Sequence, residues 1–318
     1  MRNPAAGENR GVHKDVVPVC ANFWKIRKET TLNSLSNPET VGLLAGWGQF
    51  PVEFAKKAKA LGIPVITVGL RDSASESLCE LSAAFYWSSP TRLGTMIRAF
   101  KRHGVKTIVM AGKVHKHRIM HQPWKLITLF PDWTTIRFWY GRRIDNKDDT
   151  ILLGIIRVFE REGIKVGSAL DLCPELLVTA GILTRRKPST AELLDIDFGW
   201  ALAMEMGRLD VGQSVMVKDR SVLAVEAVEG TDQAIMRAGS LCRSGGFTVV
   251  KVAKPQQDMR FDVPTIGVNT VENIHKAGGK VLAVEAGKTI LLDPEGTLAK
   301  ADKLGVTIVA RASHSSAS

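Results

Sequence analysis

The sequence predicts an α/β protein with two lobes, an N-terminal Rossmann-like βαβ domain followed by a C-terminal mixed α/β domain. Apolar runs with strand character alternate with segments of helical periodicity, which is typical of α/β domains. A length of 318 residues exceeds the usual size of one domain, and a hydrophobic fraction of 45% fits a globular chain. No apolar run reaches the roughly 18 residues that a membrane-spanning helix needs.

Five segments are predicted along the chain: a flexible extension (1–38), a Rossmann-like N-terminal domain (39–172), a linker (173–188), a C-terminal α/β catalytic domain (189–313) and a disordered tail (314–318). The extension mixes basic, polar and small residues and lacks the apolar core of a secretory signal. The four cysteines stand far apart, with the spacing of neither a zinc site nor a disulfide framework. A reducing cytoplasm therefore fits best.

The segment from Val41 to Leu70 has the order strand, glycine turn, helix and strand, which is the outline of a βαβ unit. Its turn either brings backbone N–H groups to a phosphate at the start of the helix or is a tight turn without a ligand. The turn consists of Gly46, Trp47, Gly48 and Gln49. It lacks the third glycine of a dinucleotide fingerprint, and Arg71 rather than an acidic residue follows the second strand. A dinucleotide-dependent oxidoreductase is therefore the weaker alternative.

A second candidate loop follows the predicted helix Thr91–His103 and the predicted strand Lys106–Met110. It begins with Gly112 and Lys113 at the carboxyl end of the strand, where open α/β sheets bind ligands. A solvated basic loop without a ligand is the alternative. The loop continues through His115 and His117, which supply two metal ligands and no third.

Residues 118–147 interleave aromatic and basic side chains. This composition suits a membrane interface, an acyl-chain groove, stacked nucleic-acid bases or an inter-domain packing surface. The next predicted helix, Ile151–Glu162, is preceded by Asp148 and Asp149. These carboxylates either cap the helix or serve as ligands for a metal ion or water.

In the second lobe, Ser189 and Glu192 have the spacing of a capping box, and the helix it starts continues towards Arg208. A strand hairpin follows, with its strands at Ser214–Val217 and Val222–Val228. The remaining predicted elements are the helix Asp232–Leu241, the strand Thr248–Ala253, a dense polar loop at Lys254–Gly267, the helix Glu272–Ala277, the strands Val281–Val284 and Thr289–Leu292, the helix Leu298–Leu304 and the strand Thr307–Ala310.

The stretch Leu223–Asp232 carries the strongest candidate for chemistry. An apolar strand leads into Glu226 and Glu229, Gly230 permits a sharp turn, and Asp232 stands where the next helix starts. In one interpretation, Thr231 and Asp232 simply cap that helix. In the other, Glu226, Glu229 and Asp232 converge on a divalent cation whose shell is completed by phosphate oxygens. A formal charge of +11 favours an anionic partner, and nucleic-acid binding without catalysis is a further alternative.

Six motifs occur together in the order GLLAGWGQFPVEFA, AGKV, KDDTILL, GRLDVGQ, VLAVEAVEGTD and KPQQDMRFDVPTIG. On these motifs the chain resembles, from about Val41 to about Val309, the UDP-2,3-diacylglucosamine pyrophosphatase family of lipid A biosynthesis, of the type unrelated to calcineurin-like phosphoesterases. The resemblance implies two lobes with the active site between them and a requirement for Mg²⁺. Trp47 departs from the small residue expected in the first glycine turn.

The resemblance also implies the reaction, in which water cleaves the pyrophosphate of UDP-2,3-diacylglucosamine to give 2,3-diacylglucosamine 1-phosphate and UMP. By position, Asp232 matches the aspartate expected to be essential, acting on magnesium or on the attacking water. Glu226, Glu229 and Asp149 are lesser candidates for the metal. The expected substrate-binding residues are the glycine turn Gly46–Gln49, together with Gly112, Lys113, Lys254, Gln257, Arg260, Asp262, Thr265 and Gly267.

The expected partners follow from the substrate. It is an anionic glycolipid, so the resemblance implies a cytoplasmic enzyme in transient peripheral contact with the inner leaflet of the inner membrane. No nucleic-acid partner is expected. The sequence leaves open the acyl-chain preference, the phosphorus atom that water attacks and the oligomeric state. A homodimer is one of the open options.

Overall fold

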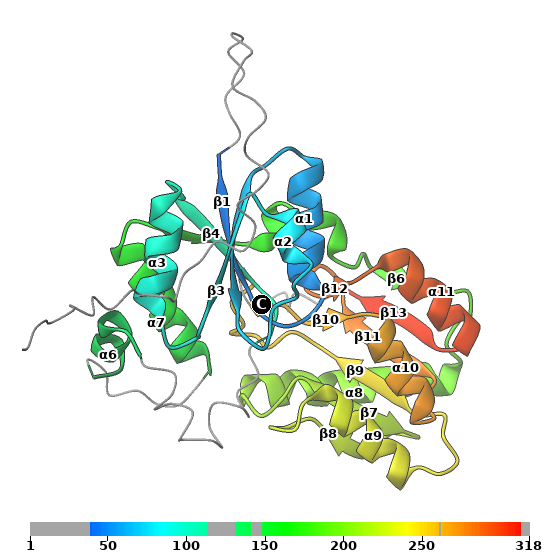
Figure 1. The fold of residues 1–318 in the computed structure, drawn as a ribbon. Coiled ribbons are helices and arrows are strands. Elements are labelled where there is room, and N and C mark those ends of the chain that lie inside the picture. The colour runs from blue at the N-terminus through cyan, green and yellow to red at the C-terminus, as the bar shows by residue number, and fades with distance from the viewer. Residues whose placement is uncertain (1–38, 114–130, 141–147, 261, 313–318) are drawn as a thin grey trace, which may run out of the picture. The chain divides into compact units, whose positions relative to one another are not determined.

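The computed structural model describes residues 39–113, 131–140, 148–260 and 262–312 (Figure 1). Contacts divide the chain into two units, Met1–Val166 and Gly167–Ser318, called unit 1 and unit 2 below. The predicted flexible extension, the predicted tail and most of the aromatic and basic segment lie outside the described residues. No described helix is long and apolar enough to cross a membrane.

Unit 1 is built on a five-stranded sheet with the strand order β3-β2-β1-β4-β5. Strand β1 pairs in parallel with β2 on one side and β4 on the other. The elements are β1 (Val41–Ala45), α1 (Phe50–Ala60), β2 (Val65–Leu70), α2 (Leu78–Leu81), β3 (Ala84–Ser88), α3 (Leu93–Arg102), β4 (Thr107–Ala111), α6 (Trp133–Tyr140), α7 (Asp148–Arg161) and β5 (Lys165–Gly167). The predicted βαβ unit is confirmed as β1-α1-β2.

Helices cover both faces of the unit 1 sheet, with α1 and α2 on one side and α3 and α7 on the other (Figure 1). Phe54 of α1 and Phe100 of α3 are buried, and Phe100 packs edge-on against Phe159 of α7 with ring centroids 6.2 Å apart. The strands are apolar along their length because both faces are covered. The Rossmann-like architecture predicted for this lobe is thus confirmed.

Unit 2 contains a six-stranded mixed sheet with the order β6-β13-β11-β9-β7-β8 and a separate two-stranded sheet, β10-β12. Its elements are η1 (Ala169–Asp171), η2 (Pro174–Leu176), β6 (Gly181–Ile182), α8 (Thr190–Arg208), β7 (Ser214–Lys218), β8 (Ser221–Val225), α9 (Thr231–Leu241), β9 (Thr248–Lys251), β10 (Thr265–Ile266), α10 (Val268–Lys276), β11 (Val281–Glu285), β12 (Ile290–Leu291), α11 (Pro294–Leu304) and β13 (Thr307–Arg311). The mixed α/β architecture predicted for this lobe is confirmed.

The large sheet of unit 2 has a core on each face, because successive strand residues point to opposite sides. Met216, Val249 and Leu282 face the side covered by α9, α10 and α11. Val217 and Val250 face α8. Residues 173–188, predicted as a linker, contain η2 and β6, and β6 is an edge strand that pairs with β13.

Three predicted boundaries in unit 2 shift by more than two residues. Strand β8 ends at Val225 rather than at Val228, and Val228 is 89% exposed, so the segment Glu226–Gly230 is a turn. Helix α10 begins at Val268, four residues before the predicted start, since the polar loop ends in strand β10 and Gly267 directly precedes the helix. Helix α11 begins at Pro294, where the Asp293 side chain accepts a hydrogen bond from Gly296 N.

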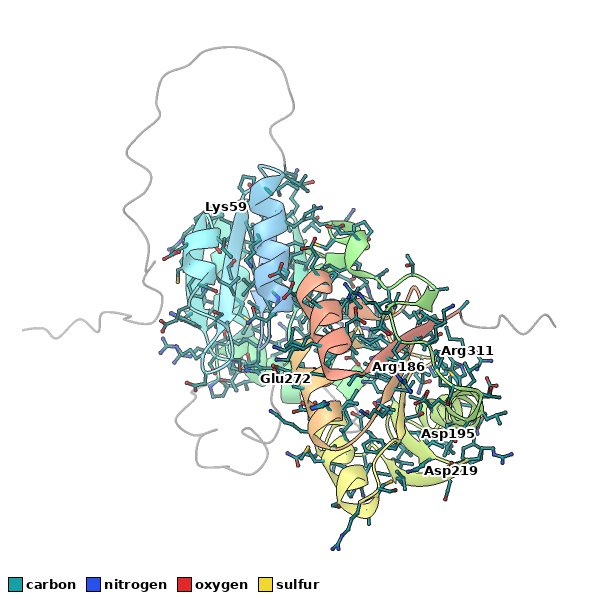
Figure 2. All side chains as sticks on the ribbon, turned by 90° about the vertical axis from the view of Figure 1, so that its right-hand side faces the viewer. Lys59, Arg186, Asp195, Asp219, Glu272 and Arg311 are labelled. Atoms are coloured by element: carbon teal, nitrogen blue, oxygen red, sulfur yellow. The ribbon has the colours of Figure 1, made fainter. Side chains whose placement is uncertain are left out.

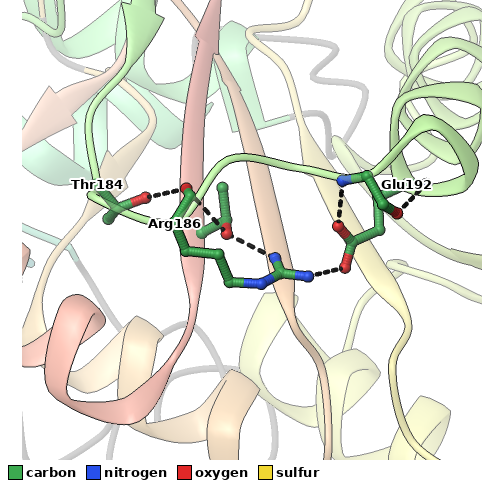
Figure 3. Close-up of polar contacts among 5 residues, drawn as sticks. Thr184, Arg186 and Glu192 are labelled. Carbon is green, nitrogen blue, oxygen red and sulfur yellow. Dashed lines mark hydrogen bonds and ion pairs between the residues drawn. The ribbon is translucent and has the colours of Figure 1, made fainter.

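The long helix α8 begins at the predicted capping box. Ser189 Oγ accepts a hydrogen bond from Glu192 N at 3.3 Å, and the Glu192 carboxylate accepts one from Ser189 N at 2.7 Å. Arg186 extends this contact, because its guanidinium donates to Glu192 Oε1 and to Thr307 Oγ1 of β13, both at 2.6 Å (Figure 3). The start of the helix is thereby tied to the sheet that the helix covers.

Candidate functional site

The two glycine loops predicted in unit 1 meet at the carboxyl ends of its strands. They follow β1 and β4, which are neighbours, while the connection from β1 leads away to β2 on the other side. Such a reversal of strand order leaves a crevice at the carboxyl ends of the strands where α/β proteins bind ligands. Trp47 N donates to Lys113 O, and Lys113 N donates to Trp47 O, both at 2.8 Å. These two hydrogen bonds join the loops.

Glycine is required where these loops touch. A Cβ atom on Gly46 would lie 2.7 Å from Lys113 O, and one on Gly112 would lie 2.8 Å from Trp47 O. Gly112 also has a φ of +90°, which side chains other than glycine rarely adopt. Gly48 has a φ of +116° and open space around it, and Gln49 precedes α1 without a side-chain cap. The structure therefore brings together all six of the predicted residues in these two loops.

In unit 2, the turn after β8 places its three carboxylates in different surroundings. Glu226 is 8% exposed and accepts a hydrogen bond from Thr231 Oγ1 at 3.0 Å. Glu229 forms an ion pair with Arg237 of α9 at 2.6 Å and accepts a hydrogen bond from Ala227 N. Asp232 is the second residue of α9 and is exposed to solvent. The expected convergence of these three residues on one cation is not found.

The expected helix cap also differs. Gly230, with a φ of +85°, is the residue before α9, and it provides no side-chain cap. Thr231 is already inside the first turn, and its hydroxyl points to the sheet rather than to the helix N–H groups. It lies 3.3 Å from Lys251 Nζ of β9 and 3.3 Å from Ser214 Oγ of β7. Thr231 thus joins the start of α9 to two strands and to Glu226.

The edge of the sheet beside this turn contains buried polar atoms without a hydrogen-bond partner in the described part of the chain. They are Oε2 of Glu226 and Oε1 of Gln213, and Nε2 of Gln257, in the loop after β9, is likewise buried and without a partner there. Gln213 precedes β7, and its carbonyl accepts from Val252 N just after β9, while Glu226 N donates to Ser214 O. A buried polar group without a partner costs free energy unless water, an ion or a ligand satisfies it. This edge is therefore the candidate site of unit 2.

The polar loop after β9 contains cations that already have acidic partners. Lys254 Nζ lies 2.6 Å from Asp210 Oδ1. Arg260 donates three side-chain hydrogen bonds to Asp258. These bonds hold the pKa of Asp258 below its ordinary value, although partial burial opposes the shift. A phosphate could bind either cation only by sharing it with, or displacing, its carboxylate.

The remaining predicted residues of this loop have mainly structural contacts. Gln257 Oε1 accepts from Lys254 N at 3.0 Å, which fixes its amide with Nε2 directed away from that bond. Asp262 N donates to Asp258 O, and Thr265 Oγ1 donates to Val263 O. Gly267 precedes α10, where an added Cβ would make ordinary contact with Leu292 Cβ at 3.4 Å. Asp149 lies in the first turn of α7, and its side chain is outside the described residues.

No group of three or more His, Cys, Asp or Glu residues that could hold a metal ion occurs among the described residues. Magnesium, however, is commonly held by one or two carboxylates together with substrate phosphates rather than by a complete set of protein ligands. The buried, unpartnered oxygen of Glu226 is compatible with that smaller ligand set.

The sequence predicts no site role for Lys251, Ser214 and Gln213, although the structure places them beside Glu226 and Thr231. The strand predicted at Thr248–Ala253 contains Lys251, and in the structure this residue is only 4% exposed. A lysine inside the run Thr248–Ala253 was the available signal, because a buried amine needs acceptors. Ser214 and Gln213 gave no comparable signal, since their place beside Glu226 depends on strand pairing.

Comparison with known proteins gives matches over both units. A family model described as the LpxI N-terminal domain matches residues 40–176, and one described as the LpxI C-terminal domain matches residues 179–309. The chain is also 31% identical over 280 residues to a Caulobacter vibrioides protein named UDP-2,3-diacylglucosamine pyrophosphatase LpxI. That alignment covers 85% of this chain and 96% of the relative.

Proposed function

The chain belongs to the LpxI family, and from this membership we propose that it hydrolyses the pyrophosphate bond of UDP-2,3-diacylglucosamine in lipid A biosynthesis. The products are 2,3-diacylglucosamine 1-phosphate and UMP. The structural observation that best supports the proposal is the turn after β8, where the exposed Asp232 stands at the start of α9 and directly follows Thr231, whose hydroxyl donates to the buried carboxylate of Glu226. A diphosphate hydrolase needs carboxylates so placed to position a water molecule or a metal ion.

We assign Asp232 the central role, with its carboxylate acting on the attacking water or on magnesium. Glu226 is the second candidate ligand, whereas Glu229 would first have to leave Arg237. Magnesium, when bound, would neutralise charge on the phosphoryl oxygens. Lys113 of unit 1 and Lys254 and Arg260 of unit 2 are proposed to face phosphate, and Gln257 and Asp262 to orient the sugar or uridine.

The glycine loops of unit 1 are proposed to contact the substrate through their backbone. Gly46, Trp47, Gly48, Gln49 and Gly112 lie at a sheet edge typical of ligand sites. Thr265 and Gly267 precede α10 in unit 2, where backbone N–H groups of the first helical turn are available to an anion.

A thin-layer assay of UDP-2,3-diacylglucosamine hydrolysis, with and without magnesium, tests the reaction and the cofactor. Asp232→Ala should abolish turnover while substrate binding is retained. Glu295→Ala is the matched control, because Glu295 is exposed and is likewise the second residue of its helix, α11. If Asp232→Ala hydrolyses substrate at a rate near that of Glu295→Ala, the assignment is wrong. Activity that survives complete removal of divalent cations would exclude the proposed magnesium requirement.

Peripheral contact with an anionic membrane is part of the proposal, because the substrate has two acyl chains. Residues 1–166 contain 26 Lys and Arg against 14 Asp and Glu, whereas residues 167–318 contain 17 against 18. The positive charge is therefore in unit 1. On its helix α6, Trp133 is 77% exposed and Arg137, one turn later, is also exposed. Such a pair suits a headgroup region, where each cation contributes about 1 kcal/mol.

Liposome sedimentation tests this membrane contact. Binding to vesicles with anionic lipid should fall as salt is raised, and the double variant Trp133→Ser, Trp139→Ser should bind less than the wild type. Leu241→Ser in unit 2 is the control, since Leu241 is 63% exposed but belongs to the unit without excess positive charge. Equal binding of all three proteins would remove the lipid role from this segment.

A further inference from the structure

We infer that Lys251 and Thr231 are positioning residues for the proposed hydrolysis, holding the first turn of α9 and the Glu226 carboxylate in a fixed arrangement. This inference rests on the proposed function. It assigns a role to a buried amine and a hydroxyl that do not themselves touch substrate.

The hydroxyl of Thr231 is the centre of the arrangement. It donates to Glu226 Oε1 at 3.0 Å, so its oxygen is free to accept, and Lys251 Nζ donates to that oxygen at 3.3 Å. The three side chains come from the turn after β8, the start of α9 and the end of β9. A hydroxyl can donate once and accept twice, and here both functions are used. Valine, which has nearly the same shape, would lose all of these bonds.

The side chains in this arrangement are buried, so water cannot readily replace the hydrogen bonds that they make to one another. Lys251 is 4% exposed and Glu226 is 8% exposed. Charged groups so placed retain their positions only through specific partners. The backbone of Lys251 is also held in place, because its Cα is the register partner of Ser214 in the pairing of β9 with β7. Ser214 Oγ lies 3.3 Å from Thr231 Oγ1, which adds a second contact from that strand.

The start of α9 depends on these contacts because it has no side-chain cap. Gly230 lacks a side chain, and its φ of +85° is accessible mainly to glycine. One backbone hydrogen bond, from Ala234 N to Gly230 O at 3.2 Å, closes the first turn. Asp232 directly follows Thr231, so loss of the Thr231 hydroxyl contacts would let the Asp232 carboxylate move. Small displacements of a reacting group lower rates strongly, by about 100-fold per ångström.

The test compares Thr231→Val with Thr231→Ser. Thr231→Val should lower kcat by roughly 10- to 100-fold with little change in KM, because the chemical step rather than substrate binding needs the fixed turn. Thr231→Ser keeps the hydroxyl and should restore most of kcat. Lys251→Met should also lower kcat, and the double variant should lose less than the two single losses multiplied together, because both changes remove the hydrogen bond between Lys251 and Thr231.

Thr248→Val is the matched control. Thr248 lies on the same strand as Lys251, is fully buried, and has a hydroxyl without a hydrogen-bond partner in the described part of the chain. Its replacement should leave kcat unchanged. If Thr248→Val loses as much kcat as Thr231→Val, the effect belongs to the strand as a whole and the inference is wrong.

Hydrogen exchange gives a readout that does not depend on activity. In Thr231→Val, amide protection should fall in the first turn of α9 and remain unchanged in β11.

If Asp232→Ala is inactive while Thr231→Val keeps both kcat and protection, the inference fails and the proposed function stands. If Asp232→Ala stays active while protection falls in Thr231→Val, the catalytic assignment fails and the structural coupling stands. If Lys251→Met does not fold, the comparison of Thr231→Val with Thr231→Ser still tests the inference, because neither substitution removes a charged side chain.

Discussion

In the described part of unit 1 the buried polar side chains are hydroxyls, among them Thr67, Ser88 and Thr135. Unit 2 also buries hydroxyls, and in addition it buries the ionisable side chains of Asp195, Glu226, Lys251 and Glu285. Five buried side-chain atoms without a hydrogen-bond or ion-pair partner among the described residues also belong to unit 2, namely Gln213 Oε1, Glu226 Oε2, Thr248 Oγ1, Gln257 Nε2 and Thr289 Oγ1. Glu285 Oε1 forms an ion pair with Lys288 Nζ at 2.9 Å.

This difference separates two ways of making a ligand site. Unit 1 contains an excess of Lys and Arg over Asp and Glu in its sequence, and it presents backbone at the carboxyl ends of β1 and β4, where glycines allow close approach. Unit 2 is nearly neutral and holds ionisable side chains inside its structure. We propose that unit 1 attracts and holds an anion and that unit 2 carries out the chemistry. Four experiments on stability test how far this contrast extends.

The largest effect is expected for Gly112→Ala in unit 1. The new Cβ would lie 2.8 Å from backbone atoms of Gly46 and Trp47, and the φ of +90° would be strained. We expect a loss of about 3 kcal/mol in the free energy of unfolding of unit 1, measured by hydrogen exchange of its strands. Gly104→Ala is the control, with a positive φ of +66° but nothing within 4 Å, and should lose only about 1 kcal/mol. Equal losses would mean that loop contact is unimportant.

The second effect concerns a buried charge in unit 2. Asp195 of α8 is 4% exposed and accepts hydrogen bonds from Asp219 N at 3.1 Å and Arg220 N at 2.7 Å (Figure 2). Both of these turn residues have positive φ, so the turn between β7 and β8 needs the carboxylate to hold it. Asp195→Ala should cost about 2 kcal/mol of unfolding free energy, because two donors lose their acceptor.

Asp197→Ala provides the control for that measurement. Asp197 belongs to the same helix but its side chain is 61% exposed, with an ion pair to Arg311. Its loss should cost under about 1 kcal/mol, as for other exposed ion pairs. If the two variants unfold at the same urea concentration, the buried carboxylate of Asp195 is not a main support of unit 2.

A third, smaller effect is expected at the start of α8. Ser189→Ala removes one side of the capping box and should cost unit 2 about 1 kcal/mol. Gln49→Ala, at the equivalent position before α1 in unit 1, should cost close to nothing, because Gln49 makes no side-chain cap. Thermal unfolding of the two variants compares them directly. A larger loss for Gln49→Ala would contradict the view that unit 1 relies on backbone contacts there.

The smallest effect is a difference in pH dependence. Burial lowers the pKa of His103 in unit 1 below its ordinary value of 6.5, and Arg102 lowers it further. The unfolded state therefore binds the proton more readily, so this stabilisation of unit 1 is complete above about pH 6.5 and is lost as the pH falls through the lowered pKa. In unit 2, hydrogen bonds from Arg260 lower the pKa of Asp258 below 3.8, so its contribution is lost only in stronger acid.

Hydrogen exchange at pH 7.5 and pH 5.5 measures this difference. Protection should fall slightly in the strands of unit 1, and His103→Gln should remove the change. In the wild type at pH 7.5, the Tyr86 hydroxyl, which lies 2.6 Å from His103 Nε2, should keep its hydrogen bond with the neutral imidazole ring. An unchanged pH response in His103→Gln would assign the effect to another group.

The local sequence determined the elements and the family. The βαβ unit, the capping box at Ser189 and the order of strands and helices in unit 2 depend on residues that are near one another in the chain, and periodicity and capping record such neighbours directly. The six ordered motifs likewise determined the resemblance that the comparisons confirmed.

Only the tertiary structure decided how the candidate site is composed. Glu229 pairs with Arg237, while Glu226 reaches Thr231 and, through it, Lys251, 25 positions further along the chain. That arrangement depends on the register that sets Ser214 opposite Lys251, and on the early end of β8. Strand register is fixed by packing over the whole sheet, so three carboxylates close in sequence were separated by contacts that no local pattern records.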